Sequence, residues 1–542
     1  MKRIRITSLP TSTTAVSTRF VFILALIILL TGLIRIRWLP IPFERDEGEY
    51  AYIGQLLLQG VLPFEGAYTM KLPGTSVVYA LIMLLFGQTV VAIHFGLLLV
   101  NAGTIIAVAS LARKLKDWQA GLYAAAIYAV ISLSSSVFGF AAHSTHFVVF
   151  FALSGILLIA EGIDPIDRKK IFLGGICLGL SILMKQPGVF FAAFSMLWML
   201  FVFIRSRQFS EMWKSAGVMI SGILIPLAGL MVLLYFRGTL DRFWLFTVQY
   251  AQEYATYLTL EDGAHNFFFR MNKILREFPF LWGLMLVSLG GIFLGSKLKQ
   301  IGFLFGFLLF SFFAVCPGLF FRHHYFILLF PAIAVTAGIG ISNVQEQIRN
   351  RLQARHASYL IPLLLITALL QGVIGERWYF FDSSPENISR AMYGRNPFNE
   401  ALRIGEYLES HTQPDERIMI LGSEPEIYFY ARRRSASGYI YMYNLTEPHP
   451  FALQMQKEMI GEVEQSKPRH ILLVGTSLSW QEFFASECKV YPWVKEYCNR
   501  HYRIIGVADF ISRDRTDWSG FGVSPLNRPQ SENFMYLLER YR

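Results

Sequence analysis

Four carboxylates lie in the stretch FERDEGEYAYIGQ (43–55), just beyond an apolar run long enough to cross a membrane: Glu44, Asp46, Glu47 and Glu49. Acidic side chains at a bilayer edge are costly unless they are solvated, paired or used for chemistry. A solvated acidic loop is one interpretation of the stretch. The other is a site in which a carboxylate such as Asp46 takes the proton of an attacking hydroxyl or amine.

Basic and imidazole side chains stand at the ends of later apolar runs, at the depth of lipid headgroups. If the substrate is a sugar carried on a lipid phosphate, the lipid phosphate is a good leaving group and needs charge stabilisation more than a general acid. The candidates for this positive field are Lys71, Lys185, Arg322 and His323. His143 and His146, in AAHSTH, are candidates for a second loop that faces the acceptor. Alternatively, these side chains only reach toward headgroups at helix ends.

A metal site is conceivable from four histidines, but histidines on separate loops are a weak pattern. They are His143, His146, His323 and His324. We therefore expect no metal or other cofactor, with a divalent ion as the open alternative. The sequence has no phosphate-binding P-loop and no dinucleotide glycine motif, so nucleotide-driven transport has no support.

The composition is that of a membrane protein. The 542 residues are 54% hydrophobic and 16% charged, against roughly 25% charged in an ordinary soluble domain. The net charge of +11 does not indicate nucleic acid, because Lys and Arg recur in short clusters between apolar runs. This distribution is typical of cytoplasmic loops in membrane proteins.

Apolar segments predict about eleven membrane spans. They cover residues 19–38, 89–111, 119–137, 147–162, 171–184, 188–204, 215–236, 279–295, 301–320, 325–342 and 358–375. If the N-terminus and the basic clusters all lie in the cytoplasm, the number of membrane crossings between them must be even. This holds only if residues 72–87 do not cross completely and form a tilted or partly embedded helix. The same parity predicts that the loops 39–71, 138–146, 185–187, 237–278 and 321–324 share the outer face.

The segment EGEYAYIGQLLLQG has apolar or aromatic residues at positions 50, 53, 57 and 58. This helical spacing predicts a helix that lies on the membrane surface and fixes the carboxylates against the bilayer plane.

Beyond residue 375 the charge rises and the apolar runs shorten to strand length, as at 417–422, 470–475 and 502–510. Helical patterns alternate with them, so we expect a transmembrane domain over residues 1–375 and an extracytoplasmic α/β domain over 376–542. Cys488 and Cys498 could pair if that domain faces an oxidising compartment.

The segments RDEGEYAYIGQLLLQG and MKLPGTSVVYALIMLLFG together resemble the opening signature of membrane-embedded GT-C glycosyltransferases. The resemblance is closest to the bacterial branch related to protein O-mannosyltransferases and to the aminoarabinose transferase that modifies lipid A (glycosyltransferase family 39). Asp46 and Glu47 match the family's Asp-Glu pair, and Lys71 stands where its basic residue precedes the next helix. LGLSILMKQPG and FRHHYFILLFPAIA are similar to later family segments.

The resemblance implies a polytopic GT-C-like protein in a bacterial inner membrane with an extracytoplasmic active site. It implies a polyprenyl-phosphate-linked sugar donor, inversion at the sugar, and Asp46 as the base with Glu47 as the second candidate. The acceptor would be a glycan, lipid or protein. Two departures are His146, where relatives often carry a second acid, and the single Pro73 followed by Gly74.

The rival hypothesis is a transporter or flippase of a lipid-linked or anionic substrate. Such a protein needs polar groups along its spans near the midplane, often in pseudo-repeats. A third class, a scaffold protein, would leave the carboxylate and cation loops without a shared cleft.

Overall fold

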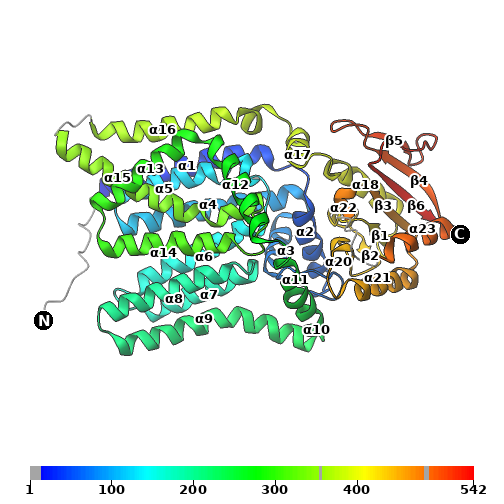
Figure 1. The fold of residues 1–542 in the computed structure, drawn as a ribbon, viewed down its shortest axis with the longest axis horizontal. Helices are drawn as coiled ribbons and strands as arrows, with labels where there is room; N and C mark the ends of the chain where they lie inside the picture. Colours follow the sequence, from blue (N-terminus) through cyan, green and yellow to red (C-terminus); the bar gives the residue numbers. More distant parts are fainter. Residues whose placement is uncertain (1–13, 353–356, 481–487, 542) are drawn as a thin grey trace.

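The computed structural model describes residues 14–352, 357–480 and 488–541. A bundle of long helices forms one end of the molecule, and a domain built on a single sheet forms the other (Figure 1). Shorter helices, among them α2 (Arg45–Leu58), α3 (Gly74–Phe86) and α11 (Ala251–Ala255), lie where the two parts meet (Figure 1). This junction contains the carboxylates of the opening stretch.

The long helices follow the apolar segments of the sequence. They are α1 (Thr14–Trp38), α4 (Val90–Leu115), α5 (Trp118–Ile131), α6 (Ser144–Gly162), α7 (Arg168–Met184), α8 (Gly188–Arg205), α9 (Phe209–Phe236), α13 (Pro279–Gly295), α14 (Leu298–Val315), α15 (Phe330–Leu352) and α16 (Ala357–Gly375). Each of the eleven apolar segments therefore coincides with a helix.

Among the described residues, six helices are long and apolar enough to cross a membrane, or seven if α12 (Leu260–Glu277) and α13 count as one bent span. The two are bent by 101° at their junction. Helices α5, α7 and α13 have only 14, 17 and 17 residues, which is short for a complete crossing. The count of about eleven crossings therefore stays a prediction. Residues 72–87 contain the expected short apolar helix, α3, and its tilted or partly embedded placement stays a prediction.

Helix α2 begins where its own acidic residues cap it. The side chain of Glu44 accepts a hydrogen bond from the backbone N–H of Glu47 at 3.0 Å, and the Glu47 carboxylate faces the N–H of Glu44 in return. This reciprocal arrangement satisfies backbone donors that the first turn leaves free. Two of the four carboxylates thus have a structural task.

Protein surrounds helix α2, and its expected position at the membrane surface stays a prediction. Ten consecutive residues of α2, from Glu47 to Leu56, are buried, because α3 packs on one side and α19 (Glu426–Ala431) on another. A Cβ on Gly48 would lie 2.5 to 2.6 Å from backbone atoms of Glu426. Only glycine allows these two helices to come so close.

Several short elements connect the longer helices along the chain. They are the 3-10 turns η1 (Ser135–Val137) and η3 (His323–Leu328), helix α10 (Leu240–Trp244), and the π-helical turns η2 (Leu245–Tyr250) and η4 (Trp378–Asp382). Helix α12 carries its polar and apolar residues on opposite faces.

The C-terminal domain contains a mixed six-stranded sheet in the order β2-β1-β3-β6-β4-β5. Its strands are β1 (Arg417–Leu421), β2 (Arg434–Ser435), β3 (His470–Gly475), β4 (Tyr502–Asp509), β5 (Asp517–Gly520) and β6 (Phe534–Arg540). The first three in this order are parallel and the remaining pairs are antiparallel. The expected strands at 417–422, 470–475 and 502–510 are confirmed as β1, β3 and β4.

Helices surround this sheet. They are α17 (Pro385–Tyr393), α18 (Phe398–His411), α19, α20 (Tyr443–Thr446), α21 (Ala452–Ser466), α22 (Ser477–Trp480) and α23 (Val490–His501). Cys488 and Cys498 are both free thiols, so they are not bridged. The domain boundary at residue 375 stays a prediction.

The C-terminal domain is fastened to α2 by polar contacts. The Nε of Arg45 donates to the carbonyl of Ser423 at 2.6 Å, and its Nη2 pairs with Glu424 at 2.7 Å. The amide of Gln55 donates to the carbonyl of Phe429 at 3.1 Å. The helix that carries the acidic stretch is therefore held by residues 374 to 379 positions away.

Candidate active site

A cavity of about 650 Å³ opens at the junction of the bundle, α2 and the C-terminal domain. Each of the five loops expected on the outer face contributes to its lining, through Asp46, His143, Lys185, Tyr250 and Arg322 respectively. The loops therefore share one cleft, although they are far apart in the sequence.

Lys71 joins two carboxylates in this cavity. Its Nζ lies 2.6 Å from Oδ1 of Asp46 and 2.5 Å from Oε2 of Glu49. Asp46 and Glu49 are three positions apart on α2, so their side chains project from the same face of the helix. The carboxylate of Asp46 is partly exposed to the cavity at 28%, whereas that of Glu49 is buried at 3%.

Burial alone would raise the pKa of Asp46, but the charge of Lys71 holds it well below its usual range. Burial raises the pKa of Glu49 despite the same ammonium. Asp46 is therefore ionised near neutral pH and available to accept a proton, with Lys71 balancing its charge.

Glu47, the second candidate for catalysis, points away from the cavity. Its side chain is fully buried, and Oε1 lies 2.9 Å from Nε2 of His94 and accepts the N–H of Ala142 at 2.6 Å. It is absent from the residues that line the cavity. We interpret Glu47 as a residue that locks α2 onto the bundle.

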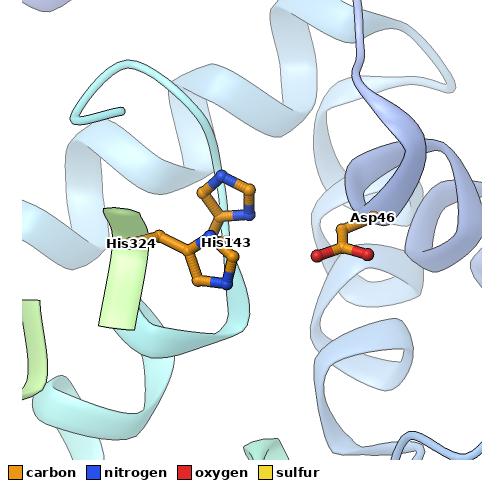
Figure 2. A group of neighbouring side chains, drawn as sticks. All are labelled: Asp46, His143 and His324. Atoms are coloured by element: carbon orange, nitrogen blue, oxygen red, sulfur yellow. The ribbon is translucent and has the colours of Figure 1, made fainter. Parts of the chain in front are cut away.

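His143 and His324 form a stacked pair opposite Asp46 (Figure 2). Their ring centroids are 3.9 Å apart, and one ligand atom from each of the three side chains lies within 4.8 Å of the others. Both ring nitrogens of His143 are buried without a hydrogen-bond partner among the described residues. One carboxylate and two imidazoles are a suitable donor set for a divalent transition metal.

Lys185 and Arg322 lie on the wall of the cavity that the bundle provides. The Nζ of Lys185 sits 3.9 Å above the ring centroid of Tyr325, and Arg322 donates to the hydroxyl of Tyr254 at 2.8 Å. Burial lowers the pKa of Lys185 to about 7; the charge of Asp46 opposes this shift and Arg322 adds to it. The charges thus interact across one space.

The other two candidate histidines, His323 and His146, have different surroundings from Lys185 and Arg322. The Nε2 of His323 accepts from Arg270 at 2.7 Å, and Nδ1 lies 2.7 Å from the carbonyl of Ser136. Burial lowers the pKa of His323 to about 3, so this ring is neutral and brings the charge of Arg270 to the cavity edge instead. His146 is buried at 1% exposure and does not line the cavity.

Sequence reasoning missed the wall that the C-terminal domain contributes. Tyr441, Tyr443, Asn444 and Glu447 line the cavity from this side. The hydroxyl of Tyr250 donates to Oε2 of Glu447 at 2.5 Å, and burial raises the pKa of Glu447 to about 7. The compact polar and aromatic run YMYNLTE was the available signal, but nothing local connects it to Asp46.

Comparisons with known proteins agree on the fold. Residues 71–235 match the family described as Dolichyl-phosphate-mannose-protein mannosyltransferase. A comparison with curated proteins gave no match. The structure is similar to that of ArnT from Cupriavidus metallidurans bound to undecaprenyl phosphate, with a TM-score of 0.56 and 14% identity over 84% of this chain and 93% of that chain.

Two structures of archaeal oligosaccharyltransferase from Archaeoglobus fulgidus are also similar. AglB in complex with an inhibitory peptide and a dolichol-phosphate gives a TM-score of 0.54 and 12% identity over 94% of this chain and 75% of that chain. The complex with Zn and sulfate gives 0.50 and 13% over 92% and 74%. Together with its long apolar helices, this likeness makes the chain an integral membrane protein with a GT-C-like glycosyltransferase fold.

Proposed function

We propose that the protein is an inverting glycosyltransferase that moves a sugar from a polyprenyl-phosphate donor to an acceptor outside the cytoplasm. The observation that carries this proposal is one cavity that joins the ionised carboxylate of Asp46 to the cations Lys185 and Arg322. A displacement at the anomeric carbon needs a proton acceptor on one side and charge stabilisation of the leaving group on the other.

In the proposed step, the acceptor oxygen or nitrogen attacks C1 of the sugar while the bond from C1 to the phosphate oxygen breaks. The acceptor's proton passes to Asp46, and the electron pair of the broken bond leaves with the polyprenyl phosphate. The phosphate gains one negative charge in this step. A single displacement from the opposite face inverts the anomeric configuration.

Lys185 and Arg322 are the groups that we place on the departing phosphate. Arg322 can hold two phosphate oxygens with its planar guanidinium, while Lys185 supplies a point charge. Lys71, which the sequence suggested for the same role, is already paired with Asp46 and Glu49. We therefore assign it to keeping Asp46 ionised, and we give His323 only an indirect part through Arg270.

The relatives support a lipid-linked donor. ArnT is bound to undecaprenyl phosphate and AglB to a dolichol-phosphate, and a polyprenyl phosphate is the lipid part of the donor proposed here. We extend this to a glycan, lipid or protein acceptor and to a bacterial inner membrane with the C-terminal domain outside.

The rival class, a transporter or flippase, receives less support. Its binding groups would lie along the spans near the midplane, whereas the charged groups here gather in a cavity beside α2 and the C-terminal domain. A scaffold protein would have no reason to bring the carboxylates and cations together.

A divalent cation is an optional partner of the site. Asp46, His143 and His324 would hold it, because their ligand atoms converge and neither ring nitrogen of His143 makes a hydrogen bond with the described residues; its Nδ1 lies 3.6 Å from Oε1 of Glu44. When bound, such an ion would supply positive charge in the cavity beside Asp46.

Metal content tests this part of the proposal. In purified protein loaded with zinc, we expect about one ion per chain and a loss of at least about tenfold in affinity in His143→Ala and His324→Ala. His265→Ala is the control, because His265 is exposed on α12. Equal zinc binding in all four proteins would remove the ion from the proposal.

Radiolabelled sugar transfer tests the function itself. The donors are undecaprenyl phosphates carrying mannose, glucose or aminoarabinose, and the acceptors are membranes from a strain that lacks the gene. We expect transfer from at least one donor and a loss of at least about a hundredfold in Asp46→Asn, the usual scale for losing a general base.

Glu65→Gln is the matched control, because Glu65 belongs to the same loop but pairs with Arg237 outside the cavity. It should transfer at the wild-type rate. Near-normal turnover in a folded Asp46→Asn protein would refute the role of Asp46.

A further inference from the structure

One short segment of the C-terminal domain lines the cavity. Tyr441, Tyr443, Asn444 and Glu447 form what we call the outer wall, at and around helix α20. The rings of Tyr441 and Tyr443 lie 5.6 Å apart between centroids. The outer wall therefore combines two aromatic rings, an amide and a carboxyl group in seven consecutive positions.

One end of the outer wall faces the base. The Nζ of Lys71 lies 5.6 Å from the ring centroid of Tyr441, and the phenol of Tyr441 interacts electrostatically with Asp46 and Glu49. The guanidinium of Arg45, next to Asp46 in the chain, lies 5.6 Å from the ring centroid of Tyr443. This end of the outer wall is therefore beside the acidic face of α2.

The other end faces the proposed phosphate site. Glu447 interacts electrostatically with Arg322, and both residues also line a small neighbouring cavity with Tyr254. Tyr250, which donates to Glu447, belongs to the rim of the bundle. The outer wall thus extends from the base to the cation that would hold the phosphate.

Two polar atoms of the outer wall lack partners. The hydroxyl of Tyr441 and Oδ1 of Asn444 are buried and make no hydrogen bond with the described residues. Asn444 is only 5% exposed. A buried polar atom without a partner costs free energy, so such atoms in a cavity wall indicate a ligand that completes them.

We propose that the outer wall is the subsite for the glycosyl ring of the lipid-linked donor. This inference rests on the proposed function, because the ring must lie between the phosphate at Arg322 and the base Asp46. A sugar ring offers hydroxyls around its edge, which pair with the free atoms of Tyr441 and Asn444. Its C–H faces suit the tyrosine rings.

Binding measurements on the full-length protein in nanodiscs separate the sugar from the phosphate. The probes are undecaprenyl phosphate and undecaprenyl phosphate carrying mannose, glucose or aminoarabinose. In the wild type, we expect at least one sugar-bearing lipid to bind more tightly than undecaprenyl phosphate. In Tyr441→Phe, which removes only the hydroxyl, we expect this lipid to bind about 3- to 10-fold more weakly.

Asn444→Leu should cause a similar loss for the same lipid. Both variants should bind undecaprenyl phosphate within about twofold of the wild type, since the outer wall does not hold the phosphate in this proposal. Tyr439→Phe is the matched control, because its hydroxyl donates to Glu458 and it does not line the cavity.

Three results would overturn the inference. One is an equal loss of undecaprenyl phosphate binding in the variants, another is unchanged binding of every probe, and the third is a wild type that gains nothing from the sugar. Transfer measured in the same preparations keeps the two proposals apart. If the wild type transfers a sugar but the binding results differ from those expected, only the sugar subsite at the outer wall is refuted. If no sugar is transferred from any donor, the proposed enzymatic function is refuted, and the subsite that rests on it with it.

Discussion

Lys71 is the main charge that keeps Asp46, the proposed base, ionised. Without its ammonium group, the burial of Asp46 and the nearby Glu49 would both favour the protonated form. A carboxylate paired with an ammonium is a weak base in the resting site. The acceptor hydroxyl becomes more acidic as its oxygen bonds to the sugar. A weak base is then sufficient, because the proton moves late in the reaction.

The pH dependence of donor use should report Lys185. Burial lowers the pKa of Lys185 to about 7, so its positive charge is present below pH 7 and is lost as the pH rises. We expect kcat/KM for the donor to fall above pH 7, by up to about tenfold per pH unit for one required proton. In kcat, the fall should move to higher pH, because the bound phosphate stabilises the ammonium.

Carboxyl groups of the cavity change charge in the same direction. Burial raises the pKa values of Glu44 and Glu49, and raises that of Glu447 to about 7, so each makes the cavity more negative as the pH rises. Lys185→Arg keeps its charge and should show a shallower alkaline fall, while Glu447→Gln removes the contribution of that carboxyl. An unaltered profile in Lys185→Arg would mean that another group titrates.

At the scale of elements, α2 carries the proposed base and is held from two sides. Its inner side is fixed by Glu47 to His94 and the loop before α6, and its outer side by Arg45 and Gln55 to the C-terminal domain. A carboxylate on such a helix keeps its position while the lipid and the acceptor enter. Rigid placement of a base contributes directly to the rate.

Gly48→Ala tests this packing. The added methyl would lie 2.5 to 2.6 Å from Glu426 in α19, so the two helices must separate. We expect a loss of about 1–3 kcal/mol in stability, the usual cost of overpacking, together with reduced transfer. Thermal unfolding in detergent, followed alongside activity, measures both effects.

Gly217→Ala is the control in helix α9, where an added Cβ would meet no atom within 4 Å. It should be neutral or slightly stabilising, because alanine favours the helix. A Gly48→Ala protein as stable and active as this control would show that the contact between α2 and α19 has no role in holding the base.

At the scale of the whole molecule, the cavity exists only where the bundle and the C-terminal domain meet. The turn between α8 and α9 lies at the opposite end of the molecule from the sheet (Figure 1). The basic cluster Arg205–Arg207 belongs to this turn. Two other basic clusters, 113–116 and 297–299, lie close together, because the side-chain amide of Gln300 donates to the carbonyl of Leu115. If basic loops face the cytoplasm, the cavity and the sheet face outside.

Reporter fusions test this orientation. Alkaline phosphatase fused after Arg542 should be active, because the enzyme folds only outside the cytoplasm, and a fluorescent protein that requires the cytoplasm should stay dark there. Fusions within Arg205–Phe209 should give the reverse result. A C-terminal fusion that fluoresces would place the cavity on the cytoplasmic side and end the proposal of an extracytoplasmic acceptor.

The sequence by itself determined what depends on neighbours along the chain. Apolar runs became helices, because such runs are satisfied by their own backbone hydrogen bonds. Short apolar runs bounded by polar residues became β1, β3 and β4. The loops that carry Asp46, Lys185 and Arg322 could be grouped on one face, because the parity of spans depends only on charge and length.

Only the tertiary structure decided which side chains meet. Asp46 and Glu47 are neighbours in one motif, yet helical geometry directs the first into the cavity and the second into the core. The burial of α2 and the contribution of Tyr441 depend on contacts across large sequence distances, and the pairing of Lys71 joins residues 22 and 25 positions apart. Such contacts follow from packing and leave no local pattern, so periodicity and motifs cannot reveal them.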